Sequence, residues 1–229
     1  MRIGGLQPTS LVDYPGTVSS VVFTVGCNFR CPYCHNAELV YETPERIIDE
    51  EEVFGFLESH RGVLPAVVVT GGEPTMHEDL PQFLARLRAM GFLVKLDSNG
   101  THPKMLKDIV SAGSVQYIAM DIKAPLAHYS RSVGAAVNTD AIQESVAFLR
   151  EGMVDYEFRT TVVRSQLTPE DIMQIGKEIQ GARRYYLQQF NPLKTLHPSF
   201  HTKLAYSRVQ LDDMAGALSP YVDYCGVRA

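Results

Sequence analysis

Six short apolar segments, separated by amphipathic stretches, are the feature that most limits what this sequence can fold into. The segments are rich in Val, Ile, Tyr and Phe and lack strict alternation with polar residues. That pattern is typical of parallel strands buried on both faces of a sheet. The sequence therefore predicts strands over residues 18–25, 66–70, 92–97, 116–122, 156–163 and 184–190.

Helical periodicity fills the intervals between these segments. Asp49, with Glu52 three residues later, has the spacing of a capping box, and Asp79 is a candidate N-cap for the next helix. Thr168, followed by Pro169, marks the start of another helix. Further helices are predicted over residues 103–112, 142–149 and 207–218.

Strands that alternate with helices predict an α/β fold, and right-handed crossovers would curl it into a partial (β/α)6 TIM-like barrel. The 229 residues, 45% of them hydrophobic, suit one domain with one substantial core. We expect residues 1–17 to form an N-terminal hairpin or cover. Residues 18–192 would be the barrel core, and residues 193–229 a C-terminal extension with a short strand near 221–227.

Composition argues against several classes of protein. The net charge of -5 and the absence of a long Lys/Arg block speak against a general nucleic-acid binder. No segment reaches the roughly 18 apolar residues of a membrane span, and the first residues lack the apolar stretch of a signal peptide. Four cysteines, three of them clustered, do not suggest a secreted disulfide scaffold, so we expect a reducing cytoplasm.

The three clustered cysteines, Cys27, Cys31 and Cys34, have the spacing C-x3-C-x2-C. Such a short loop points three thiolates at one inorganic centre and supplies no fourth, which leaves a coordination position open for chemistry. The alternative is a zinc site with Cys225 or His35 as the fourth ligand. Zinc motifs usually come as two ligand pairs, and no second pair follows here.

Polar clusters follow the other predicted strands, at the end of an α/β barrel where active sites lie. Arg159 lies within the fifth predicted strand. The clusters are Gly71-Gly72-Glu73-Pro74, Asp97-Ser98-Asn99-Gly100, Asp121 with Lys123, and the segment that contains Gln189 and Asn191. Their meeting at one barrel mouth predicts an active site there.

The run from Cys27 to Cys34, with Tyr33 directly before the third cysteine, resembles the signature of the radical S-adenosylmethionine (SAM) superfamily. That resemblance implies a [4Fe–4S] cluster held by Cys27, Cys31 and Cys34, with the amino and carboxylate groups of SAM on the fourth iron. An electron from the cluster would then cleave SAM to a 5′-deoxyadenosyl radical. Cluster and cofactor carry this chemistry, while the protein positions them and excludes water.

The resemblance also implies roles for the polar clusters. Gly71, Gly72 and Glu73 match the family motif that contacts the SAM amino group, and Tyr33 would lie beside the cofactor. Asp97, Ser98 and Asn99 match a strand-end segment around SAM. In the Asp-x-Lys pair, Lys123 would meet the SAM carboxylate, and Asp121 a ribose hydroxyl or a nearby cation. Gln189 lies where the family often contacts methionine or adenine.

A narrower resemblance is to glycyl-radical-enzyme activating proteins. The segments GCNFRCPYCHN, which begins at Gly26, and SLVDYPG, which begins at Ser10, carry it. The likeness is greatest to the activating proteins of anaerobic ribonucleoside-triphosphate reductase. It implies hydrogen abstraction from a glycine Cα of such a partner, with Asp13 and His35 touching the glycine loop. It also implies a flavodoxin- or ferredoxin-type electron donor. A second cluster is not expected, because only Cys225 lies outside the motif.

Two other functions compete with this interpretation. One is a radical SAM enzyme that modifies a small molecule or peptide, similar to 7-carboxy-7-deazaguanine synthase. It would share the cluster and cofactor but not the glycyl partner. The other belongs to a different class, a non-catalytic iron–sulfur or zinc protein with a filled coordination sphere.

Overall fold

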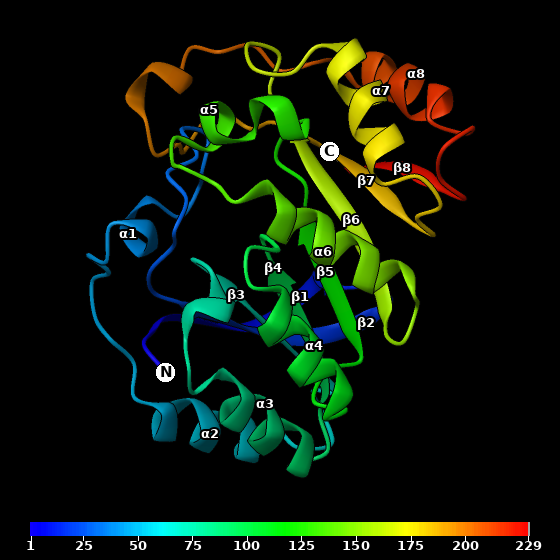
Figure 1. Cartoon of the computed structure of the whole chain (residues 1–229). Coiled ribbons are helices and arrows are strands. Elements are labelled where there is room, and N and C mark those ends of the chain that lie inside the picture. Colours follow the sequence, from blue (N-terminus) through cyan, green and yellow to red (C-terminus); the bar gives the residue numbers. More distant parts are fainter. Residues whose placement is uncertain (229) are drawn as a thin grey trace.

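One curled sheet of eight strands runs through the structure, a computed structural model that describes residues 1–228 (Figure 1). The strands lie side by side in chain order, and from the second onwards every neighbouring pair is parallel. The six predicted strands appear within one residue of their expected bounds as β2 (Thr17–Thr24), β3 (Ala66–Gly71), β4 (Leu93–Ser98), β5 (Tyr117–Asp121), β6 (Asp155–Val162) and β7 (Tyr185–Gln189). The predicted α/β fold with a partial TIM-like barrel is confirmed.

Two further strands extend the sheet at its sides. The N-terminal segment forms β1 (Ile3–Tyr14), which pairs antiparallel with β2 as a hairpin. The C-terminal segment ends in β8 (Cys225–Arg228), which pairs parallel with β7. In the sheet formed by residues 1–228, β1 and β8 are the two edges, so the barrel is open along the side between them.

Residues 1–228 form eight α-helices, of which α1 and α5 lie at the carboxyl ends of the strands while the others cover the outer face of the curled sheet (Figure 1). They are α1 (Ala37–Val40), α2 (Glu50–Ser59), α3 (Leu80–Ala89), α4 (Pro103–Ser111), α5 (Tyr129–Val133), α6 (Thr139–Arg150), α7 (Pro169–Glu178) and α8 (Arg208–Ala217). Single 3-10 turns occur at η1 (Pro74–Met76), η2 (Leu126–His128) and η3 (Pro198–Phe200). No helix within residues 1–228 is long and apolar enough to cross a lipid bilayer.

The helix starts follow the predicted capping only in part. Thr168 forms a full capping box with Asp171 at the start of α7. The box predicted at Asp49 is wrong, because Asp49 makes no side-chain bond to α2 and Glu52 instead forms an ion pair with Arg46. Asp79 also makes no capping bond to α3; its carboxylate pairs with the N-terminal amino group. At both helix starts a cation binds the carboxylate (Glu52 or Asp79) that would otherwise accept a hydrogen bond from a backbone amide of the helix start.

A small apolar cluster fills the lower part of the barrel and supports the site above it. It consists of Tyr14, Val21, Ala66, Val68 and Tyr117, all buried. Because side chains alternate along a strand, Ala66 and Val68 share the inner face of β3 with Thr70, which lines the cavity described below. The larger apolar core lies between the sheet and the surrounding helices. Polar side chains are therefore concentrated at the carboxyl ends of the strands.

Candidate active site

A cavity of about 360 Å³ opens at the carboxyl ends of the parallel strands, within the size range of small-molecule sites. Its wall contains all but one of the residues to which the family resemblance assigns a role in binding the cluster, SAM or the partner. These are Asp13, Cys27, Cys31, Tyr33, Cys34, His35, Gly71, Gly72, Glu73, Asp97, Ser98, Asn99, Asp121 and Lys123. The exception is Gln189, whose amide donates to the carbonyl of Tyr206 at 2.8 Å, while the preceding Gln188 lines the cavity.

The cysteine loop between β2 and α1 presents three free thiols to this cavity. Cys31 is buried, and Cys27 and Cys34 are half-buried. The loop is tied to distant segments by its backbone. The Arg30 amide donates to the Val133 carbonyl at the end of α5 at 2.8 Å, and the Pro32 carbonyl accepts from the His197 amide at 2.9 Å. The loop is thus held from both sides before any cofactor binds.

Burial sets the protonation of these thiols. It raises the pKa of Cys27 to about 12, helped by the nearby Glu73 carboxylate, and the pKa of Cys31 to about 11. Burial also raises the pKa of Cys34. The thiols are therefore neutral at pH 7 in the protein alone, and they become thiolates only where a metal replaces their protons.

The geometry of the cysteines bears on the zinc alternative. Within residues 1–228, no three His, Cys, Asp or Glu side chains converge closely enough to hold a single metal ion. A [4Fe–4S] cluster has a different requirement, because each thiolate binds its own iron. Cys225 is not an available fourth ligand, because it pairs with Tyr185 at the amino end of β7, away from the cysteine loop.

The Gly71-Gly72 turn is locked against the start of the cysteine loop. Gly71 has φ of +114°, which favours glycine, and a Cβ there would meet the Thr24 backbone nitrogen at 2.4 Å. A Cβ on Gly72 would lie 1.9 Å from the Gly26 carbonyl oxygen. That same Gly26 carbonyl accepts a hydrogen bond from the Glu73 amide at 2.8 Å. Only residues without side chains allow the two backbones to approach this closely.

Glu73 is 1% exposed and its carboxylate is fixed by donors from two segments. Oε1 accepts from the Thr75 amide, the Thr75 hydroxyl and the Ser98 hydroxyl, the last at 2.9 Å. Oε2 accepts from the Asn99 amide at 2.6 Å. Burial raises the pKa of Glu73 even though these hydrogen bonds oppose the shift. With one bond to Oε2 and three to Oε1, Oε2 retains acceptor capacity for a cationic ligand.

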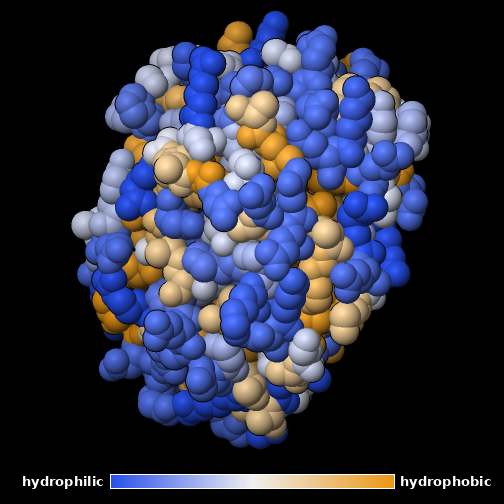
Figure 2. Space-filling view, in the orientation of Figure 1, coloured by the Kyte–Doolittle hydropathy of each residue, from blue (hydrophilic) through white to orange (hydrophobic). Residues whose placement is uncertain are grey.

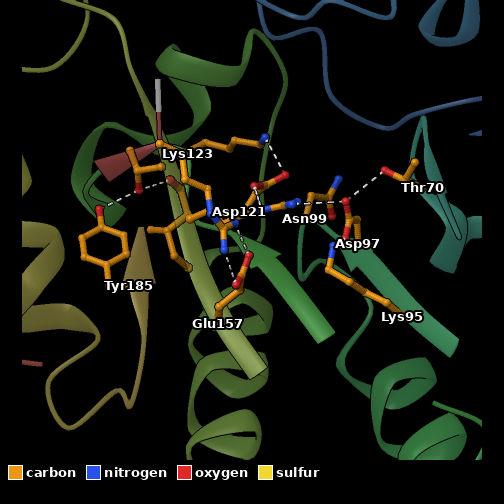
Figure 3. A network of polar contacts seen from close by, with 12 residues as sticks. Thr70, Lys95, Asp97, Asn99, Asp121, Lys123, Glu157 and Tyr185 are labelled. Carbon is orange, nitrogen blue, oxygen red and sulfur yellow. Dashed lines mark hydrogen bonds and ion pairs between the residues drawn. The ribbon is translucent and has the colours of Figure 1, made fainter. Parts of the chain in front are cut away.

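A chain of alternating charges crosses the cavity floor (Figure 3). Arg159 of β6 donates from Nη1 to Asp97 at 3.2 Å and from Nε to Asp121 at 3.0 Å. Lys95 pairs with Asp97, and Lys123 Nζ lies 3.1 Å from Asp121 Oδ2. Figure 3 shows the Lys123 side chain extending towards Asp121, and Thr70 donating to Asp97 at 3.2 Å.

These cations govern the charge states of the buried acids. Burial opposes ionisation of Asp121, but Arg159 and Lys123 outweigh it and lower its pKa to about 2. The pKa of Asp97 is likewise lowered, because Arg159 and Lys95 outweigh burial. Although burial acts in the opposite direction, the carboxylate of Asp121 holds the pKa of Lys123 well above its ordinary value. Both ions of the Asp121–Lys123 pair are therefore charged at neutral pH.

Sequence reasoning missed some residues of the wall. The sequence places Arg159 only within a strand, whereas the structure pairs it in register with Asp121 of β5 and puts both in the wall of the cavity. A strand register would have found it, but no register is known from the sequence alone. Asn36 also lines the cavity, and its amide donates to the Gly71 carbonyl at 3.1 Å. It joins the cysteine loop to the glycine turn.

Three further predicted residues lie at different depths. Tyr33 is buried, and its hydroxyl has no hydrogen-bond partner among the described residues. A buried hydroxyl of this kind ordinarily has a partner, so this one is available to a bound molecule. His35 is exposed, with Nε2 3.0 Å from the Asn191 carbonyl, and Asp13 is half-buried and accepts from the Ser10 hydroxyl. Asp13 and His35 approach the cavity from β1 and from the cysteine loop.

A comparison with protein families identifies this arrangement. Residues 21–180 match the model of the radical SAM superfamily, which is more than half of the chain. The chain belongs to the radical SAM superfamily. The family's cofactors are a [4Fe–4S] cluster and SAM, and they are therefore cofactors of this chain.

The radical SAM relatives differ in activity. A protein of Methanocaldococcus jannaschii, named as a candidate glycyl-radical enzyme activating enzyme, is 30% identical over 231 residues, covering 99% of this chain and 95% of that protein. The 7-carboxy-7-deazaguanine synthase of Koribacter versatilis is 28% identical over 159 residues, 66% of this chain and 65% of that protein. Crystalline Streptococcus suis SuiB bound to SAM has a similar fold, with a TM-score of 0.72 and 13% identity, over 91% of this chain and 50% of SuiB.

The residues around the cavity fit both radical SAM cofactors. Three thiols are available to iron, and no fourth cysteine lies near them. The buried carboxylate of Glu73 and the half-buried ammonium of Lys123 are complementary to the amino and carboxylate groups of an amino-acid ligand. The unpartnered Tyr33 hydroxyl adds one more polar contact. The site therefore offers donors for a cluster and for a zwitterion next to it.

Proposed function

We propose that this chain is a glycyl-radical-enzyme activase, which abstracts a hydrogen atom from the Cα of one glycine in a partner protein. The observation that carries the proposal is the match, over nearly the full length of both chains, to a candidate activase from Methanocaldococcus jannaschii. Shorter matches to two other proteins of the same name support it. The partner that we favour is an anaerobic ribonucleoside-triphosphate reductase, because the N-terminal and cysteine segments resemble its activating proteins.

The cluster and SAM supply the electron transfer and the carbon–sulfur bond cleavage that this reaction requires. Cys27, Cys31 and Cys34 would hold three irons of the cluster. Glu73 would accept from the SAM ammonium through Oε2, and Lys123 would donate to the SAM carboxylate. These two ions would orient the amino-acid end of SAM by charge-assisted hydrogen bonds.

The rest of the wall would position SAM and exclude water. Gly71 and Gly72 let the backbone come close to the cofactor, because no side chain intervenes. Ser98 and Asn99 would line the cofactor while they hold Glu73. Asp121 would accept a hydrogen bond from a ribose hydroxyl. It can do so as a carboxylate because its ion pair with Arg159 keeps it ionised. Tyr33 would contact the cofactor through its free hydroxyl.

Asp13 and His35 would meet the partner's glycine loop. Both line the cavity, and Asp13 comes from β1, the edge strand beside the open side of the barrel. Two exposed apolar residues, Leu11 and Val12, directly precede Asp13. A macromolecular substrate needs such an accessible border, since its glycine remains attached to a folded protein.

The test is anaerobic reconstitution of the cluster, followed by incubation with SAM, a reductant and a candidate anaerobic ribonucleoside-triphosphate reductase. We expect a glycyl doublet in the EPR spectrum of the reductase and one 5′-deoxyadenosine per radical. SAM cleavage without any radical on the reductase would contradict the choice of partner. Absence of SAM cleavage would contradict the activase proposal itself.

A second candidate follows from the matches to 7-carboxy-7-deazaguanine synthases, which cover 38% to 66% of the chain. Under this candidate, the cavity would bind a small heterocyclic substrate beside SAM. The same reconstituted protein distinguishes the two functions. Incubation with heterocyclic precursors would give 7-carboxy-7-deazaguanine under this candidate and no such product under the activase proposal.

A further inference from the structure

Within residues 1–228, the cations without an ion-pair partner lie at both ends of the barrel, and one group of them lies beside the cysteine loop. Of the 21 Lys and Arg residues, 13 form ion pairs with acidic groups within residues 1–228. Four of the eight others end helices α3, α6 and α7 or precede β7, at the amino ends of the strands: Arg88, Arg150, Lys177 and Arg183. The remaining four lie at the carboxyl ends of the strands, near the cysteine loop: Arg30, Arg131, Arg164 and Lys203.

These last four residues, which we call the loop-side cations, surround the outer side of the cysteine loop. Arg30 belongs to the loop, and its guanidinium donates to the Cys27 carbonyl at 2.5 Å. Arg131 is in α5, whose last residue accepts from the Arg30 amide. Lys203 follows η3, in the segment that His197 ties to Pro32 of the loop. The three arginines are exposed and Lys203 is half-buried.

A groove of about 420 Å³ lies between these segments. Arg131 and Lys203 are in its wall with Ser165, the residue after Arg164. The one acidic residue of the wall, Asp171, is half-buried, and its carboxylate accepts from the Thr168 amide at the start of α7. Hydrophilic residues predominate in the upper part of Figure 2, where Figure 1 places α5 and the segment around η3. The groove is thus polar, with an excess of positive charge.

The position of this surface indicates what binds there. Under the proposed function, SAM and the substrate glycine occupy the inner side of the cysteine loop, where Glu73 and Lys123 lie. An electron for the cluster therefore arrives most directly from the outer side of the loop, where the loop-side cations are. The chain as a whole has a net charge of -5. The loop-side cations attract an acidic partner to the end of the barrel that carries the cysteine loop, which the equally numerous unpaired cations at the amino ends of the strands do not.

We propose that the loop-side cations and the groove between α5 and η3 are the docking surface for a small acidic protein that carries one electron at a time. The inference rests on the proposed function for the placement of SAM and glycine in the cavity. In the step it serves, the reduced carrier loses one electron and the cluster gains it. No bond forms or breaks in this step and no proton moves.

The test uses the double variant Arg131→Glu/Lys203→Glu, with Arg150→Glu/Lys177→Glu as the matched control. Both change the net charge by the same amount, and both spare the residues that hold the cysteine loop. The first measurement is calorimetric binding of oxidised bacterial flavodoxin, as the probe, to the cluster-loaded proteins without SAM. The second is the rate of 5′-deoxyadenosine formation with reduced flavodoxin, and separately with dithionite, at low and at high ionic strength.

We expect the loop-side double variant to bind flavodoxin at least about tenfold more weakly, with the control variant unchanged. In the loop-side double variant, the rate of 5′-deoxyadenosine formation with reduced flavodoxin falls by a similar factor at low salt. Its rate with dithionite equals that of the wild type. Equal flavodoxin affinity in the two double variants would overturn the proposal, as would selective loss of affinity for the glycyl-radical partner instead. Failure of the activase function gives a different result. The protein would still cleave SAM with electrons from flavodoxin, but no glycyl radical would form on the partner.

Discussion

Arg159 and Asp121 lie opposite each other on adjacent strands, and the Arg159 Nε donates to Asp121 Oδ1 at 3.0 Å. The same guanidinium reaches Asp97 of β4, so one cation contacts two half-buried carboxylates. Lys123 completes the group from the end of β5. This relationship fixes the charged state of the cavity floor before any ligand binds, and it has measurable consequences for stability.

Replacing Arg159 by methionine removes the cation that the largely enclosed carboxylates of Asp97 and Asp121 share. We expect Arg159→Met to lower the free energy of unfolding by about 3–5 kcal/mol at pH 7, because removal of one partner from a buried ion pair leaves an uncompensated charge. Chemical denaturation of the apoprotein measures this change. Adding Asp97→Asn to Arg159→Met should recover part of the loss, whereas additive losses would show that the pairing does not account for it.

The same group predicts an acid-side dependence of stability. The pKa of Asp121 in the folded state is about 2, below the ordinary value of an unfolded Asp near 3.9. A lowered folded pKa stabilises the protein above the unfolded pKa, and this stabilisation is lost as the pH falls from about 4 towards 2. Urea unfolding across that range should show the loss in wild type and a smaller loss in Asp121→Asn. Identical pH profiles would contradict the assignment.

The three cysteines should be individually required for the cluster. We expect Cys27→Ala, Cys31→Ala and Cys34→Ala each to lose reductive SAM cleavage, because each thiolate binds its own iron. Iron content and 5′-deoxyadenosine formation after anaerobic reconstitution are the measurements. Cys225→Ala is the control. Cys225 begins β8 and pairs with Tyr185 at the amino end of β7, away from the cysteine loop, so this variant should keep both the iron and the activity. Normal cleavage in any loop variant would remove that cysteine from the ligand set.

Lys123 should contribute to SAM affinity but not to the cluster. Lys123→Ala removes a half-buried ammonium, and a hydrogen bond to a charged group contributes about 1.5–3 kcal/mol, so SAM should bind about 10- to 100-fold more weakly. Calorimetry on the reconstituted protein measures the affinity, and the iron content should not change. Lys107→Ala, at an exposed ion pair with Glu144, is the control and should bind SAM normally. Unchanged affinity of Lys123→Ala would return Lys123 to a packing role.

Gly72 should tolerate no side chain. In Gly72→Ala the new Cβ would meet the Gly26 carbonyl oxygen at 1.9 Å, so the backbone has to move and Glu73 with it. We expect a lower melting temperature and weaker SAM binding. Gly216→Ala in α8 is the control, because its Cβ would meet nothing within 4 Å and alanine favours a helix by about 1 kcal/mol. A Gly72→Ala protein as stable as Gly216→Ala would disprove the close approach.

The sequence predicts the strands well because each one is a short apolar run ended by a polar cluster. The bounds of β2 to β7 follow from this pattern within one residue. It does not predict the full length of β1, whose exposed and buried residues follow no simple alternation because register shifts interrupt its pairing with β2. It also fails at the capping sites of α2 and α3, where Glu52 pairs with Arg46 and Asp79 pairs with the N-terminal amino group instead of a local backbone amide.

The sequence predicts those residues of the candidate site that directly follow a strand. It does not predict those whose position depends on how neighbouring strands are aligned. Glu73, Asp97 and Lys123 follow apolar runs, so they were found directly. Arg159 contributes through its alignment with Asp121, which depends on how β5 and β6 pair. Gln188 rather than Gln189 faces the cavity, because neighbouring residues of a strand point to opposite sides and the starting face cannot be read from two identical side chains.

The contact between Gly72 and Gly26 links two motifs that are far apart in the sequence. The Glu73 amide and the Asn36 side chain reinforce the same junction. Anyone who transplants the cysteine segment into another scaffold must therefore move the glycine turn together with it, as one graft. A chimera that exchanges only one of the two pieces would join surfaces that were never fitted to each other.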